Sequence, residues 1–106
     1  MITKVFSVFD SKACMFNTPF FVVNRPAAIR NFSDLANDPQ SFIFKHAGDF
    51  VLYEIGEYDD DKGLLIPHAQ HVHLGVASQF KASSSEGVFN DSFKDMVRGK
   101  VQEVVQ

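Results

Sequence analysis

Runs of apolar residues, separated by polar turns, divide most of the chain into candidate strands. The first run is apolar on both faces of an extended chain, which is typical of a central strand. Two later runs flank Asp59-Asp60-Asp61-Lys62-Gly63, a turn sequence that predicts a hairpin. The last run alternates between polar and apolar residues, as a half-buried strand does. The predicted strands cover residues 2–9, 19–23, 50–58, 64–66 and 71–77.

Two other segments carry apolar residues at helical spacing. Asn24-Arg25-Pro26 favours the start of a helix, since proline fits the first helical position, and Asn37-Asp38-Pro39 favours its end. Its apolar face would consist of Ala28, Ile29, Phe32, Leu35 and Ala36. Residues 40–46 are compatible with a short helix or a strand. A second amphipathic helix is predicted from about Asp91 to Val105, with an apolar stripe of Phe93, Met96, Val97, Val101, Val104 and Val105.

These elements predict an α+β fold. It would have a small antiparallel or mixed sheet of about five strands, two to three helices and a C-terminal amphipathic helix. Helical crossovers between successive strands are too few for a doubly wound parallel sheet. A stretch of small polar residues predicts a linker, so we expect an α+β body at 1–81, a linker at 82–90 and the C-terminal helix at 91–106.

The charge of the chain argues against a protein whose whole surface binds nucleic acid. The net charge is −3 over 106 residues, whereas nucleic-acid affinity comes mainly from lysine and arginine. The charges are unevenly placed, however, because residues 47–61 hold six acidic side chains and no basic one. Residues 1–46 hold five basic side chains, Lys4, Lys12, Arg25, Arg30 and Lys45, so one basic face remains compatible with the acidic total.

The cysteine content and the lack of long apolar runs favour a protein of a reducing compartment without a transmembrane helix. A single cysteine, Cys14, allows no internal disulfide and suits a reducing compartment. We expect Cys14 to be an inert thiol, because Lys12 is its only nearby cation. The N-terminal residues lack the layout of a signal peptide, and no apolar run is long enough for a transmembrane helix, so no membrane association is expected.

Few side chains suggest catalysis or metal binding. His68, His71 and His73 lie close in sequence, and the last two share a strand face, but a zinc site needs three or four ligands. A solvated polar face is therefore favoured over a metal site. Asp59-Asp60-Asp61 lacks the spacing of a calcium loop. No phosphate-binding, nucleophile or metalloprotease motif occurs, so we expect neither an enzyme nor a cofactor.

Basic and aromatic residues alternate in the first half of the chain. Single-stranded nucleic acid is bound by cations that follow the phosphates and by rings that stack on the bases. The predicted phosphate contacts are Lys4, Lys12, Arg25, Arg30 and Lys45, and the predicted stacking residues are Phe20 and Phe21. The alternative is that the phenylalanines fill the core and the basic side chains only form a solvated surface around it.

An ordered set of segments resembles one protein family. The segments are VFSVFDSKA (5–13), PFF (19–21), AAIRNFSDLANDPQS (27–41), HAGDFVLYEIGEYDDDKG (46–63) and LGVA (74–77). Together they resemble the small nonstructural protein of the gokushovirus branch of the Microviridae, phages with circular single-stranded DNA. The positions that this pattern marks are Asp10, Ser11, Lys12, Ala13, Pro19, Phe20, Arg30, Phe32, Gly56 and Gly63.

The resemblance implies a DNA-associated role at the stage of single-strand synthesis or genome packaging, in the host cytoplasm. The first hypothesis is therefore a non-catalytic phage protein that binds single-stranded DNA. The second is a protein–protein interaction module that binds no nucleic acid and contacts a viral or host protein. We also expect a homodimer or higher homo-oligomer whose interface includes Phe93, Met96, Val97, Val101 and Val104.

Overall fold

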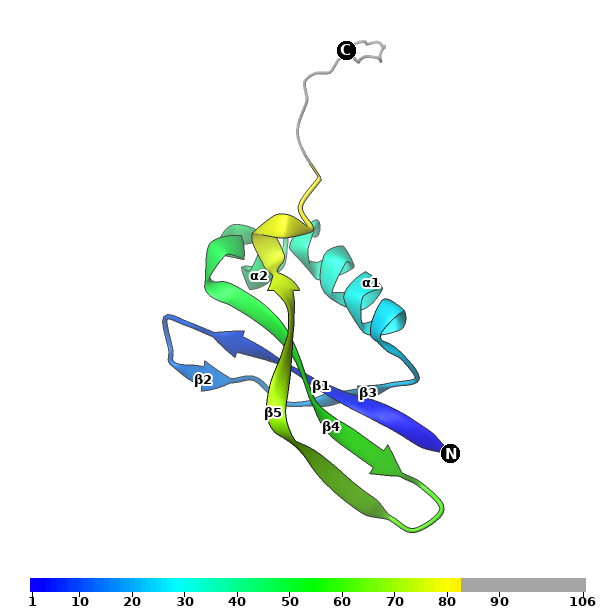
Figure 1. Cartoon of the computed structure of the whole chain (residues 1–106). Helices are drawn as coiled ribbons and strands as arrows, with labels where there is room; N and C mark the ends of the chain where they lie inside the picture. Colours follow the sequence, from blue (N-terminus) through cyan, green and yellow to red (C-terminus); the bar gives the residue numbers. More distant parts are fainter. Residues whose placement is uncertain (83–106) are drawn as a thin grey trace, which may run out of the picture.

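The computed structural model describes residues 1–82, which form a twisted antiparallel sheet with helices on one face (Figure 1). In chain order, the strands and α-helices are β1 (Ile2–Asp10), β2 (Met15–Phe16), β3 (Phe20–Val22), α1 (Arg25–Ala36), α2 (Phe42–Lys45), β4 (Phe50–Asp59) and β5 (Leu64–Val76). Short 3₁₀ turns at Ala47–Asp49 and Ala77–Gln79 precede β4 and follow β5.

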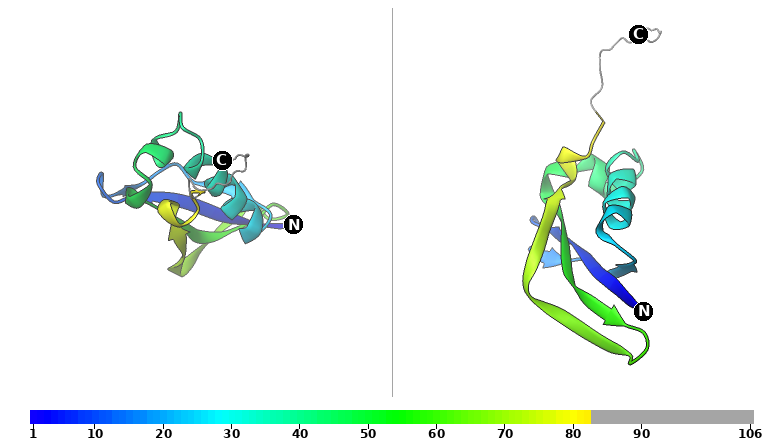
Figure 2. Two further views of the ribbon diagram at one scale, coloured as in Figure 1. Left: turned by 90° about the horizontal axis from the view of Figure 1, so that it is seen from above. Right: turned by 45° about the vertical axis from the view of Figure 1, so that its right-hand side comes forward.

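Strand β1 lies at the centre of the sheet. It pairs on one side with β2 and β3 and on the other side with β4, and within residues 1–82 β5 pairs with β4 alone. All of these pairings are antiparallel. The long hairpin of β4 and β5 extends well past the helices, as Figure 1 and the right-hand view of Figure 2 show.

The pairing of β5 with β4 is interrupted halfway along the hairpin. Pro67 pairs with Gly56 and Val72 pairs with Glu54, so residues 68–71 lie opposite the single residue Ile55. Extra residues in one strand of an antiparallel pair bend that strand and increase its twist. Strand β5 therefore changes direction here, and His68 lies at the start of the bend.

Helix α1 begins at the cap that the sequence predicts. The side chain of Asn24 accepts a hydrogen bond from the Ala27 amide at 2.9 Å, and Pro26 occupies the first turn. Ala28, Phe32 and Ala36 recur every four residues, so they share one helix face and are buried against the sheet. Asn37 then joins the end of α1 to the segment after β5, because its side chain donates to the Phe80 carbonyl at 2.9 Å.

The core lies between α1 and one face of the sheet. Phe32 from α1 packs there with Phe6 of β1 and Leu52 of β4, and all three are almost fully buried. Removing these large apolar side chains from water supplies the main favourable free energy of folding. The complete buried cluster consists of Phe6, Val8, Ala28, Phe32, Ala36, Ala47, Phe50, Leu52 and Ala77.

The predicted α+β fold class was wrong. Residues 1–82 are dominated by an antiparallel sheet, and within them the α-helices are only the short α1 and α2. The predicted strands 64–66 and 71–77 are a single strand, because β4 is long enough to pair with both sides of the polar interruption. The short strand β2 was not predicted at all. The predicted linker at 82–90 lies almost entirely, and the predicted helix at 91–106 entirely, outside the described residues.

Candidate functional site

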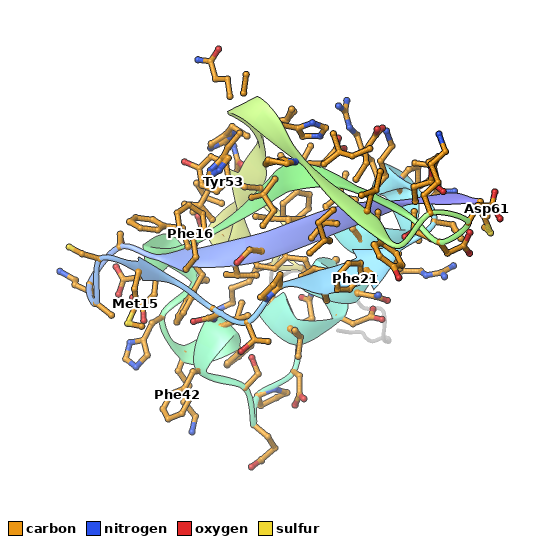
Figure 3. All side chains as sticks on the ribbon, turned by 90° about the horizontal axis from the view of Figure 1, so that it is seen from below. Met15, Phe16, Phe21, Phe42, Tyr53 and Asp61 are labelled. Carbon is orange, nitrogen blue, oxygen red and sulfur yellow. The ribbon has the colours of Figure 1, made fainter. Side chains whose placement is uncertain are left out.

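The face of the sheet opposite α1 carries a group of aromatic rings. Side chains alternate between the two faces of a strand, so Phe9 and Tyr53 point away from the face that carries Val8 and Leu52. Phe9 pairs in register with Phe16 of β2. Figure 3 shows Phe16 and Tyr53 side by side, with Phe42 on the helical side of the sheet. We call the group of Phe9, Phe16, Tyr53, His71 and His73 the aromatic face.

The rings of the aromatic face contact one another in a continuous chain. The Phe9 and Phe16 centroids are 4.9 Å apart, and Phe16 lies 5.7 Å from Tyr53 and 5.3 Å from His71. Tyr53 lies 5.5 Å from His73, its partner across the β4–β5 pair. These distances are typical of edge-to-face aromatic pairs. Because Phe16, His71 and His73 are exposed, a flat ligand can reach the rings.

Sequence reasoning found only part of this arrangement. It placed His71 and His73 on one strand face, which the alternation of β5 confirms. It did not identify Phe16 or Tyr53 as site residues. Phe16 reaches the aromatic face through the tight β1–β2 turn, where Cys14 adopts a φ of 56°, and a two-residue strand leaves almost no pattern in a sequence. Tyr53 could have been found from its alternation with Leu52 and Glu54.

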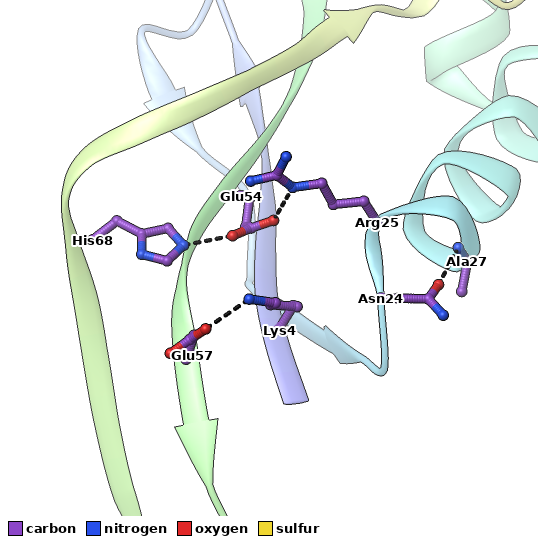
Figure 4. A network of polar contacts seen from close by, with 7 residues as sticks. All are labelled: Lys4, Asn24, Arg25, Ala27, Glu54, Glu57 and His68. Atoms are coloured by element: carbon purple, nitrogen blue, oxygen red, sulfur yellow. Dashed lines mark hydrogen bonds and ion pairs between the residues drawn. The ribbon is translucent and has the colours of Figure 1, made fainter. Parts of the chain in front are cut away.

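The helical side of the sheet holds a buried carboxylate that joins three elements (Figure 4). Glu54 of β4 is 1% exposed, and it accepts hydrogen bonds from Arg25 Nε and His68 Nε2, both at 2.6 Å. Burial raises the pKa of Glu54, but the hydrogen bonds from Arg25 and His68 outweigh burial and hold the pKa below its ordinary value. The bend in β5 is therefore connected through Glu54 to the start of α1.

The predicted phosphate contacts fall into two groups. Lys4 forms an ion pair with Glu57 at 2.6 Å, and Arg25 pairs with Glu54, so both cations already face a carboxylate. Among the described residues, no ion pair involves the other three predicted contacts. These are Lys12 in the β1–β2 turn, Arg30 on α1 and Lys45 on α2. The role of all five in binding phosphate stays a prediction.

The two predicted stacking residues differ in their surroundings. Phe20 is half-buried and stacks on Phe6 of the core, with 5.7 Å between the ring centroids. Phe21 is exposed and contacts Tyr58 of β4 at 5.6 Å. Of the two, Phe21 is therefore the one that a base can approach. Neither belongs to the aromatic face.

The three histidines do not come together. His68 is bound to Glu54 on the helical side, whereas His71 and His73 belong to the aromatic face. In residues 1–82, Asp59, Asp60 and Asp61 of the hairpin turn are the only group of three potential metal ligands. Two of them, Asp60 and Asp61, accept hydrogen bonds from the Met1 amino group. The expectation that the chain needs no metal stays a prediction.

The predicted oligomer contacts Phe93, Met96, Val97, Val101 and Val104 lie outside the described residues. Within the part of the chain that the structure describes, no helix has the length and apolarity needed to cross a membrane.

Comparison with known proteins places the chain in a phage family. The model of the Phage ORF5 protein family matches residues 3–80, and the chain belongs to this family. The match covers every strand and helix of the described structure except Ile2, the first residue of β1. No curated protein and no solved structure matches the chain. The expected phage origin is confirmed at this level, whereas the narrower gokushovirus assignment stays a prediction.

Proposed function

We propose that this member of the Phage ORF5 protein family is a non-catalytic accessory protein that binds single-stranded DNA through its aromatic face. The observation that carries the proposal is the row of contacting rings on a sheet face opposite α1. In several modules that bind single strands, bases stack on the exposed aromatic side chains of a sheet. The rings of Phe16 and Tyr53 would have this role here.

Stacking suits a protein that must bind a whole genome. Every base has a flat face, so binding on aromatic rings tolerates any sequence. Lys12 lies in the turn between β1, which carries Phe9, and β2, which carries Phe16. From this position it would contact a phosphate next to the stacked bases. The net charge of −3 opposes a polyanion, so we expect weak binding that depends strongly on salt.

The biological role that we propose follows from this chemistry and from the sequence resemblance to gokushovirus proteins. A protein that coats single strands without sequence preference would act in the host cytoplasm. It would act there during the switch to single-strand synthesis or during genome packaging.

Binding of a fluorescent single-stranded oligothymidylate at low salt tests the proposal. Phe16→Ala and Tyr53→Ala should each weaken binding by about tenfold, because each substitution removes one ring from the stacking surface. Lys12→Ala should weaken binding to all sequences alike and reduce its salt dependence.

Two further variants sharpen this test. Val23→Ala, at an exposed apolar residue just after β3, should leave the affinity unchanged. Phe21→Ala should leave the affinity unchanged if DNA binds at the aromatic face. It should lower the affinity if DNA binds at the stacking site predicted from sequence. A folded wild-type protein that binds no oligothymidylate even at low salt would contradict the proposed function.

An apolar group on the hairpin favours a second candidate function, self-association. Leu64, Leu65 and Ile66 at the start of β5 are all exposed, and among the described strands β5 has a partner on one side only. Exposed apolar edge strands readily pair with another chain. We propose a second copy of this chain as the partner, since two-fold dimers are the commonest oligomers.

Light scattering of the full chain at micromolar concentration should show a dimer. Leu65→Lys should convert it to a monomer, because a buried interface does not tolerate an unpaired charge. Met15→Lys changes an exposed apolar residue at the other end of the sheet and should leave the dimer intact. A dimer that survives Leu65→Lys would remove the hairpin from the interface.

A further inference from the structure

A cavity of about 670 Å³ opens on the helical side of the β1–β2 turn. Its inner wall is apolar, with buried Phe50, half-buried Ile43 and more exposed Leu35. Phe42 stands at its rim and is 74% exposed, which is unusual for so large an apolar side chain. Cavities of this size with apolar walls and a few polar groups are typical of small-ligand sites.

The polar side chains around this cavity are largely uncommitted. Among the described residues, the side chains of Lys12, Asn17, His46 and Asp49 form no hydrogen bond or ion pair, although the backbones of Lys12, Asn17 and Asp49 do. In contrast, Asp10 Oδ1 accepts the amides of Lys12 and Ala13 at 3.0 and 3.2 Å, which holds the turn in shape. The cavity therefore offers free hydrogen-bonding side chains, and one of the donors, Lys12, lies in the turn that Asp10 stabilises.

The cavity and the aromatic face both lie next to the β1–β2 turn. Phe9 and Phe16 lie just before and after the turn that carries Lys12, and Lys12 also lines the cavity. A bound strand that leaves the aromatic face at Phe16 would cross this turn and reach Phe42 on the helical side. A further cation, Lys45, lies 5.8 Å from the centre of the Phe42 ring.

We propose that this cavity holds one nucleotide of the bound strand, with its base against Phe42 and Leu35 and its phosphate at Lys12. The proposal rests on the proposed function and extends it from a flat stacking surface to a defined pocket. Asp10 and Asp49 on the same rim partly offset the attraction of Lys12 for a phosphate. A free mononucleotide should therefore bind weakly, and a strand anchored on the aromatic face should bind more tightly.

Titration of the ¹⁵N-labelled full chain with dTMP tests the pocket. The amide signals of residues 10–17 and 41–50 should shift at millimolar dTMP. Deoxyribose 5-phosphate, which lacks the base, should bind about tenfold more weakly, because it cannot stack on Phe42. Equal affinity for the two probes, or no shifts in these segments, would overturn the proposal.

Two matched variants separate the pocket from the stacking surface. Leu35 and Val23 are both exposed apolar residues, but only Leu35 lines the cavity. Leu35→Glu should place a negative charge on the apolar wall, where it opposes both the base and the phosphate, and so abolish the dTMP shifts and weaken oligothymidylate binding by about tenfold. Val23→Glu should change neither. Lys12→Gln, which leaves the apolar wall intact, should also weaken dTMP binding.

The results distinguish failure of the pocket from failure of the proposed function. If Leu35→Glu binds oligothymidylate as tightly as the wild type, the pocket proposal is wrong, although DNA binding by the aromatic face stands. If the wild type binds no oligothymidylate, the proposed function fails. The dTMP titration still decides whether the cavity takes a nucleotide.

Discussion

Replacement of Glu54 by alanine should lower the free energy of unfolding by about 3 kcal/mol. The carboxylate accepts hydrogen bonds from Arg25 and His68 at 2.6 Å, and it is 1% exposed. The substitution removes both charge-assisted bonds and leaves a small cavity beside the core. Urea unfolding followed by circular dichroism measures the loss.

The neighbouring ion pair provides the control for this prediction. Glu57 also lies on β4 and pairs with Lys4 at the same distance, but both of these side chains are about one-third exposed. Solvent-exposed ion pairs contribute at most about 1 kcal/mol, so Glu57→Ala should be nearly neutral. Equal losses for the two variants would show that the burial of Glu54 confers no special stability.

The ionisation of Glu54 should also make the free energy of unfolding depend on pH. Burial raises the pKa of Glu54, but the hydrogen bonds from Arg25 and His68 lower it by a larger amount. The pKa of Glu54 is therefore lower in the folded protein than in the unfolded chain. A lowered pKa means that the folded state favours the ionised form. The stabilisation is therefore complete above the ordinary value of 4.5 and is lost as the pH falls through the folded pKa. The stability difference between the wild type and Glu54→Gln should be constant near neutral pH and should shrink below pH 4.5.

Local signals in the sequence were sufficient for the elements with strong patterns. The cap at Asn24, the proline at position 26 and the four-residue spacing of Ala28, Phe32 and Ala36 predicted α1 almost to its observed bounds. The apolar run of β1 and the turn between β4 and β5 were equally clear. These features depend on neighbours in the chain, which is why a single sequence reveals them.

Contacts between distant segments were beyond such reasoning. The contact of Arg25 with phosphate stays a prediction, but its pairing with Glu54, a residue 29 positions away, was not foreseen. That pairing depends on how α1 docks against β4, and no local pattern encodes it. The aromatic face has the same origin, because it assembles Phe16, Tyr53 and His71 from three strands only once their register is fixed.

Gly56, at the centre of the hairpin, leaves no room for a side chain. Gly56 is buried in β4, between Val5 of β1 and Pro67 of β5, just before the bend in β5. A Cβ atom at this position would lie 2.7 Å from the Ile66 carbonyl oxygen and 3.1 Å from the Pro67 Cα. Both are backbone atoms of the neighbouring strand, so no side-chain rotation relieves the contact. The need for close approach also explains why the sequence resemblance marks a glycine here.

Gly56→Ala should therefore lower the free energy of unfolding by about 3 kcal/mol, because β4 and β5 must move apart to admit one methyl group. Gly48→Ala is the matched control, since nothing lies within 4 Å of a Cβ at Gly48. That substitution should change stability by less than about 0.5 kcal/mol. Urea unfolding of the two variants compares them directly. If Gly56→Ala unfolds at the wild-type midpoint, the two strands do not approach as closely as the structure shows, and the position of His68 beside Glu54 would need another explanation.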